Sequence, residues 1–342
     1  VSGNGNTAVG FQALTANTST SDNTAVGFNA LAANTSGTGA TAVGSGALGS
    51  NLSGNGNTSV GYNSLSQNTS GSNNTAFGFQ ALQANVSNFS CVAIGSQTLV
   101  SATGNNNNAL GFQALFNTTI GNQNTSIGTQ KLFLNTTGAQ NVAVGNGALL
   151  SNLIGVQNVS VGNGSLGSSA TGSSNVAVGF QALGNTLQSN NVVAVGYQAL
   201  RNSAIPQLNA TAVGYQALFT NSSGQNLTAV GYQALRSNQT SNNLTAVGHN
   251  ALFANVASDN TAVGTSTLAL NTTGTASTAV GSGALASNIT GSANTAVGYL
   301  ALASNISSSN LTAVGFQASA ANVGGTASTA IGYQALASNT TG

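Results

Sequence analysis

The chain has 342 residues, only five of which carry a formal charge, and its net charge is +1. Ordinary globular domains carry roughly 25% charged residues, so the polarity of this chain comes from Asn, Ser, Thr, Gln and Gly instead. Three Lys and Arg residues cannot form the basic groove that nucleic acids require, and no apolar run approaches the roughly 20 residues that cross a bilayer, which excludes nucleic-acid binding and membrane insertion of this segment.

One motif, Thr-Ala-Val-Gly, recurs along the whole chain. Its glycine occurs twenty times, and sixteen of the nineteen spacings are seventeen residues long. Two spacings are one residue shorter (95 to 111 and 248 to 264), and one spacing is one residue longer (196 to 214), which we interpret as a loop insertion at Pro206. This regularity predicts a single continuous repeat array over residues 1–342, taken as a segment of a longer chain. We number each unit from this glycine as position 0.

The first element expected in each unit is a short strand at positions −3 to −1, which is residues 7–9 in the first unit. Position −3 is Thr in fourteen units, position −2 is Ala in seventeen and Ser in three, and position −1 is always apolar. Side chains alternate along a strand, so positions −3 and −1 share one face. We expect Val at −1 to fill the interior together with Leu at +4.

Position −2 then points away from that interior. Only Ala and Ser occur there, which indicates tight packing, and we favour a face that packs against another chain over the alternative of a very thin coil. The predicted inter-chain face is represented by Ala8, Ala25, Ala42, Ala76, Ala177 and Ala330.

The glycine at position 0 follows, and its presence in every unit indicates a turn with positive φ or a close approach of another backbone. Representative turn glycines are Gly10, Gly27, Gly44, Gly61, Gly179 and Gly332.

Position +1 is Phe or Tyr in twelve units, including Phe11, Phe28, Tyr62, Tyr197, Tyr215 and Tyr232. Two interpretations stay open: the rings stack on one another and shield the strand, or they form a surface stripe that binds sugar or protein.

A second, weaker strand is expected at Gln-Ala-Leu, residues 12–14 in the first unit, before a turn with Asn at position +7. Asn tolerates the left-handed conformation of such a corner, and stacked Asn side chains can form an amide ladder. The alternative for this Asn is N-glycosylation, because Asn-x-Ser/Thr recurs. Examples of that sequence are Asn34, Asn68, Asn271 and Asn339.

These elements predict an all-β fold, a parallel β-solenoid or β-roll of about twenty rungs with two short strands per 17-residue rung. Helical solenoids need units of about 33 residues or more. Residue i then lies over residue i+17, and identical side chains stack into ladders.

Residues for catalysis or metal binding are scarce. His249 is the single histidine, Cys91 is the single cysteine, and Asp22 and Asp259 lie about fourteen rungs apart. Neither a catalytic triad nor a zinc site can be assembled from them. We therefore expect no catalytic residue, no metal, no cofactor and no enzymatic activity in this segment.

The Asn-Thr-Ala-Val-Gly core resembles the head repeats of trimeric autotransporter adhesins of the YadA type, and residues 91–95 (Cys-Val-Ala-Ile-Gly) and 175–179 (Asn-Val-Ala-Val-Gly) match that pattern well. The Thr-Ala-Val-Gly-Tyr-Gln-Ala-Leu units also look like repeats of phage and viral fibre proteins. The resemblance implies a left-handed β-roll, a homotrimer, a location outside the cell or on a cell or virion surface, and a host-surface protein or glycan as partner. The chain departs from the adhesin heads in its longer period and in lacking their anchor, neck and stalk.

The function expected from these observations is a structural or adhesive extracellular fibre of bundled solenoids. The alternatives are a subunit that assembles end to end into a filament and the shaft of a viral or phage fibre. A third alternative is ice binding by the Thr residues at −3. Against ice binding, Val interrupts the Thr row and the alternation turns position −3 inward.

Overall fold

The computed structural model describes residues 3–203 and 208–340, so Pro206 lies outside the described residues. The chain divides into two compact units, Val1–Ser173 and Ser174–Gly342, which are described separately. The described part of the chain contains strands and turns and no helix, and accordingly nothing in residues 3–203 and 208–340 could cross a membrane as a helix.

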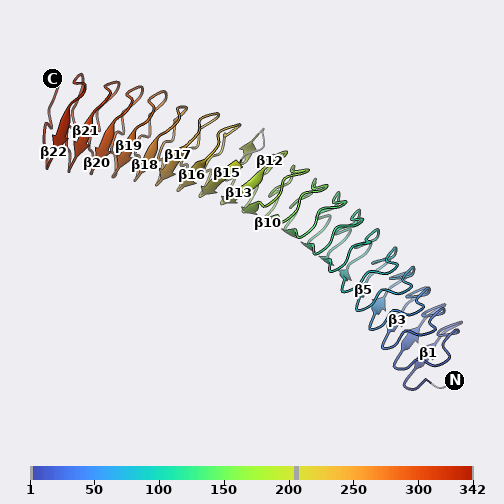
Figure 1. Ribbon diagram of the computed structural model, residues 1–342. Helices are drawn as coiled ribbons and strands as arrows, with labels where there is room; N and C mark the ends of the chain where they lie inside the picture. Colours follow the sequence, from blue (N-terminus) through green and yellow to red (C-terminus); the bar gives the residue numbers. More distant parts are fainter. Residues whose placement is uncertain (1–2, 204–207, 341–342) are drawn as a thin grey trace. The chain divides into compact units, whose positions relative to one another are not determined.

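The first unit holds ten short strands, one in each coil of the chain. Figure 1 shows how the successive coils follow one another in its blue-to-green part. Neighbouring strands pair in parallel with identical positions facing each other, for example Ala8 with Ala25. These strands are β1 (Thr7–Val9), β2 (Thr24–Val26), β3 (Thr41–Val43), β4 (Thr58–Val60), β5 (Thr75–Phe77), β6 (Val92–Ile94), β7 (Asn108–Leu110), β8 (Thr125–Ile127), β9 (Val142–Val144) and β10 (Val159–Val161).

The second unit repeats the pattern, with Thr278 facing Thr295 between β19 and β20. A separate two-stranded parallel sheet forms from β12 (Asn185–Thr186) and β14 (Asn202–Ser203). The remaining strands are β11 (Val176–Val178), β13 (Asn190–Val195), β15 (Leu208–Val213), β16 (Leu227–Val230), β17 (Leu244–Val247), β18 (Thr261–Val263), β19 (Thr278–Val280), β20 (Thr295–Val297), β21 (Thr312–Val314) and β22 (Thr329–Ile331).

The predicted parallel β-solenoid with a repeat of about seventeen residues is thus confirmed within each unit. The second strand expected at Gln-Ala-Leu is not found: among the described residues, a second strand occurs only as β12 and β14, which lie after that segment in two coils. The Gln-Ala-Leu segment is a turn in which positions +2 and +4 are left-handed, as at Gln80 (φ 53°) and Leu82 (φ 51°). Left-handed φ costs a non-glycine residue roughly 1–2 kcal/mol, which burial of the Leu side chain offsets. Asn at +7 is not among the left-handed residues, so the left-handed conformation expected there is wrong. The expected turn is present, and in one coil Asn34 Oδ1 closes it by accepting a hydrogen bond from N of Gly37 at 3.1 Å.

The interior of each coil is narrow. In β6, Ala93 at position −2 is fully buried whereas Ile94 at −1 is 39% exposed. The alternation was predicted correctly, but its two sides were assigned the wrong way round: position −2 faces inward, and positions −3 and −1 face outward. Leu at +4 is buried as predicted, for example Leu99. The interior is therefore lined by Leu and by side chains as small as a methyl group.

Side chains at −2 and +3 meet across this narrow coil, which explains why only Ala and Ser occur at −2. In two coils both positions are Ser, and their hydroxyl oxygens lie 2.5 Å apart: Ser59 with Ser64, and Ser160 with Ser165. Each −2 hydroxyl also donates to the backbone carbonyl of its partner at 2.8 Å. Ser therefore replaces Ala at −2 in these coils because a hydrogen-bond partner lies opposite.

The predicted inter-chain face at −2 is therefore wrong for the interior coils. Ala25, Ala42, Ala76 and Ala177 are completely buried inside the single chain, and Ala330 is nearly so. Ala8 is exposed, but it belongs to the first described coil, whose interior is covered on one side only. The very thin coil, the alternative left open by the sequence, is the arrangement found.

Two features require glycine at position 0, and the sequence suggested both: a positive φ and, in most coils, the close approach of the next coil's backbone. Gly10, Gly27, Gly44, Gly61, Gly179 and Gly332 have φ between 127° and 139°. A Cβ on Gly61 would lie 2.4 Å from the carbonyl oxygen of Gly78 in the next coil. No other residue can therefore take this place without moving the backbone.

Candidate interaction surface

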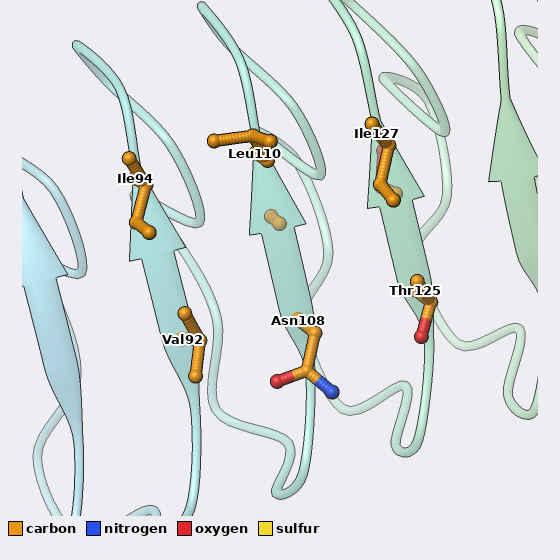
Figure 2. Close-up of a pocket in the computed structure, with 8 residues that line it drawn as sticks. Val92, Ile94, Asn108, Leu110, Thr125 and Ile127 are labelled. Carbon is orange, nitrogen blue, oxygen red and sulfur yellow. The ribbon is translucent and has the colours of Figure 1, made fainter.

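The outward side chains at positions −3 and −1 of the parallel strands form one surface in each unit, which we call the outer strand face. Figure 2 shows part of it: Val92, Asn108 and Thr125 follow one another at −3 on β6, β7 and β8, and Ile94, Leu110 and Ile127 do so at −1. Because the pairing keeps identical positions opposite each other, each position forms a row that runs from coil to coil.

The outer strand face is uncharged and half apolar. Position −3 is occupied by Thr, Val and a single Asn, and position −1 by Val, Ile, Leu or Phe in every unit. The side chains at −1 are half-buried to exposed in the described coils. Val and Ile favour the strand conformation, but their row also leaves apolar surface uncovered in coil after coil, and long exposed apolar patches mark interaction sites.

Four consecutive coils depart from the Val row at −1. Phe77, Ile94, Leu110 and Ile127 follow one another on β5–β8, and Phe77 and Leu110 are 56% and 46% exposed. An open hollow of about 150 Å³ lies on the outer strand face around β7. A cavity of that size can accommodate a benzene-sized group. We call these four coils the bulky block.

The position +1 aromatics form a second surface row. In the second unit Tyr197, Tyr215, Tyr232 and His249 stack with successive ring centroids 5.1 Å apart. In the first unit Phe11 stacks on Phe28 and Tyr62 on Phe79, each at 5.6 Å. The rings are exposed, and self-stacking is thus confirmed. Because the faces of these rings cover one another, the row presents ring edges and phenol hydroxyls outward.

The Asn residues at +7 form the amide ladder that the sequence suggested, and it lies inside the coil. The Nδ2 of Asn51 donates to Oδ1 of Asn34 at 3.0 Å, and that of Asn68 donates to Oδ1 of Asn51 at 2.7 Å. Asn34, Asn68 and Asn271 are fully buried, so glycosylation of these residues in the folded chain is contradicted. Asn339, in the last described coil, is half-buried and donates to Asn322 at 3.0 Å.

A second buried Asn row lies at position −4. Backbone N of Asn74 donates to Oδ1 of Asn57 at 2.9 Å, and Nδ2 of Asn57 donates to the carbonyl of Gly71 at 2.7 Å. This Asn belongs to the Asn-Thr-Ala-Val-Gly motif, but no role was predicted for it. The sequence feature that could have indicated a role is the recurrence of Asn immediately before the strand. In one coil Cys91 occupies this position. Burial raises the pKa of the Cys91 thiol.

Two cations have unusual surroundings. Lys131 takes the +3 place that is usually Ala, and burial lowers the pKa of its amine. Its Nζ donates to the carbonyl of Thr129 and to Oδ1 of Asn146. Arg236 lies between the rings of Phe219 and Phe253, at 5.5 and 5.7 Å from their centroids. The guanidinium of Arg236 therefore stacks on aromatic rings of the two neighbouring coils, so a charged side chain takes part in a row of stacked side chains.

Within residues 3–203 and 208–340, no three His, Cys, Asp or Glu side chains come together in a way that could hold a metal ion. Two surfaces with regular rows of side chains are the outer strand face and the aromatic row. No protein-family model and no curated protein matches the sequence.

Proposed function

We propose that the chain is a non-enzymatic segment of a structural or adhesive fibre outside the cell or on a cell or virion surface, in which copies of the chain pack together through the outer strand face. The observation that carries this proposal is the apolar residue at −1, which occurs in every unit and points out of the coil. The face expected from the sequence, position −2, is replaced by positions −3 and −1.

A second copy of the chain is the occupant that fits this face best. The rows repeat once per coil, at about 4.8 Å, and any partner must repeat with the same rise to stay in step over ten coils. Another copy does so automatically. Its face is also uncharged, so no charge on either side is buried without a partner.

Each unit offers a substantial contact area. Ten coils at about 4.8 Å give about 48 Å in each unit, and the three strand residues cover about 10 Å across, so each unit offers on the order of 480 Å². That is more than half of the roughly 800 Å² per partner of a standard stable interface.

The number of copies and the location come from the resemblance to trimeric adhesin heads, which supports a homotrimer that meets a host-surface protein or glycan. Assembly end to end into a filament, or as a viral or phage fibre shaft, is compatible with the same packing. The outward phenol row at Tyr197, Tyr215 and Tyr232 is the surface that such an assembly leaves free for a partner.

Sedimentation equilibrium of the chain tests the proposal, with three chains per particle as the expected result. The pair V280K and V297K places charges on the outer strand face and should release monomers. The matched control is I289K with I306K, because these two side chains are similarly exposed but lie outside the strands. A monomeric parent chain, or equal dissociation by both pairs, would contradict the packing.

Ice binding is a second candidate, and one finding now favours it. The argument that position −3 points inward no longer holds, because Thr278, Thr295 and Thr312 lie in register on the outward side of β19–β21. Regular outward Thr rows are the feature that this function requires. A thermal-hysteresis assay decides between the candidates, because copies packed through the outer strand face would cover those rows.

A further inference from the structure

Copies of so regular a chain have no evident reason to stay level with one another. If every coil presented the same Thr and Val, a partner could slide by one coil, about 4.8 Å, and meet the same side chains again. Chains with weakly specified register form mixtures of pairings. A defined assembly therefore needs a place where neighbouring coils differ on the outer strand face.

We propose that the bulky block on β5–β8 is this place and sets the axial register between parallel copies of the chain. The inference rests on the proposed function, since it assumes that copies pack through the outer strand face. It adds which coils make that packing specific. The partner is a second copy, placed level with the first.

The first argument is that the large side chains at −1 and the hollow on the outer strand face occur in the same coils. Phe77, Ile94, Leu110 and Ile127 are the only consecutive coils with a residue larger than Val at −1. The hollow around β7 is lined by residues of β6, β7 and β8, so it lies on the block itself. When copies are level, the extra bulk of one copy lies beside the hollow of the next. After a slide by one coil, Ile127 of one copy lies against Val144 and Phe77 of the other copy lies against Val60, so one bulky residue of each copy loses its bulky partner.

The second argument is the single amide on the face. Asn108 is the only residue at −3 that is neither Thr nor Val, and it is exposed on β7. When copies are level, the amides of Asn108 meet and can hydrogen-bond to one another. A slide by one coil in one direction places Asn108 opposite Val92, which has no polar atom to offer. One polar residue in an apolar interface is a known means of fixing register.

The test is disulfide formation between copies, in a C91A background that removes the native thiol. Chains with V26C and chains with V60C are mixed during assembly. These positions are two coils apart, about 9.6 Å along the axis, and Cα atoms more than about 7 Å apart cannot be bridged. We expect V26C chains to bridge to each other and mixed V26C–V60C bridges to stay at background.

The register variant replaces the block by the common residues, with F77V, I94V, L110V, I127V and N108T. Every replacement occurs at the same position in other coils, so the fold is retained. We expect unchanged particle mass, a severalfold loss of V26C–V26C bridges and the appearance of mixed bridges. The matched control keeps the bulk and changes only its shape, with I94L, L110I and I127L, and should retain the parent pattern.

Unchanged bridging in the register variant at unchanged particle mass would overturn the register proposal and leave the proposed function intact. A monomeric parent chain would instead overturn the proposed function. If the full variant fails to fold, as judged by circular dichroism, the pair L110V and N108T is tested with the same cysteine reporters. A smaller loss of V26C–V26C bridges, with mixed bridges appearing, supports the register proposal, and unchanged bridging overturns it.

Discussion

The interior and the outer strand face use neighbouring residues of the same strands, and they differ in how much change they accept. Position −2 is Ala or Ser in every coil, whereas position −1 ranges from Val to Phe and position −3 from Thr to Val and Asn. The interior is closed by side chains of the same coil, as at Ser59 and Ser64. In the proposed assembly, the outer strand face is limited by the copy that packs on it. Constancy at −2 therefore follows from the fold, and the variation at −3 and −1 is compatible with the proposed assembly.

The largest expected effect is at a position-0 glycine. A Cβ on Gly78 would lie 2.4 Å from the carbonyl oxygen of Gly95, at a φ of 140°. G78A should lower the local unfolding free energy by about 4 kcal/mol, because strain and a backbone clash add together. Hydrogen exchange of residues 75–95 measures this. The control is G39A, since Gly39 has φ 65° and nothing within 4 Å of an added Cβ. It should cost about 1 kcal/mol.

The second largest effect is expected from replacing a leucine that points into the coil, compared with one that points out of it. Leu99 is fully buried at +4, and Leu110 is exposed at −1. L99A should cost about 3 kcal/mol through lost burial and an internal cavity. In dissociated chains, L110A should cost less than about 0.5 kcal/mol. Denaturation of dilute monomer separates the two, and equal costs would mean that the inward and outward sides are wrongly assigned.

A smaller effect tests the contact across the coil. Ser59 and Ser64 share a hydrogen bond in the buried interior, so each single change to Ala removes the contact between the two hydroxyls and leaves the remaining hydroxyl with a backbone carbonyl as its acceptor. We expect the double-mutant cycle of S59A and S64A to show a coupling of about 1 kcal/mol. The same cycle on Val60 and Ser64 should show none, because position −1 points outward.

The smallest effect concerns pH. In the unfolded chain Lys131 keeps its proton up to its ordinary pKa of 10.5, and burial lowers that pKa in the folded chain. Between the two values the unfolded chain binds more protons, so the stability of this coil rises with pH there. K131A, which restores the common Ala, should raise stability at neutral pH by about 1 kcal/mol and remove the rise. Thermal unfolding from pH 7 to 10.5 measures both.

Much of the fold was readable from the repeat, because a nearly constant spacing of seventeen residues admits few structures. The glycine geometry, the buried Leu at +4 and the Asn ladder were each predicted from one residue and one physical reason. The inward and outward sides of the strand were not predicted correctly. Alternation along a strand implies that Ala and Val point in opposite directions, but it does not say which of the two points inward. The usual preference for burying Val gave the wrong answer.

The left-handed turns were missed for a related reason. Gly and Asn suggest positive φ by their chemistry, but Leu82 adopts it because its side chain must reach the interior, which only the closed coil shows. The hollow on β7 likewise depends on three coils lying side by side. No sequence pattern of one unit contains it.

The bonds between coils also determine how the chain responds to force. Backbone hydrogen bonds such as that from N of Gly78 to the carbonyl of Val60, at 2.8 Å, join one coil to the next. A pull on the two ends acts on these bonds one coil after another, since each coil bonds mainly to its neighbours. Each coil that opens releases about 58 Å of extended chain, from about 17 residues at about 3.4 Å each. The chain would then lengthen in equal steps under tension and absorb work at each one, which suits a tether exposed to flow.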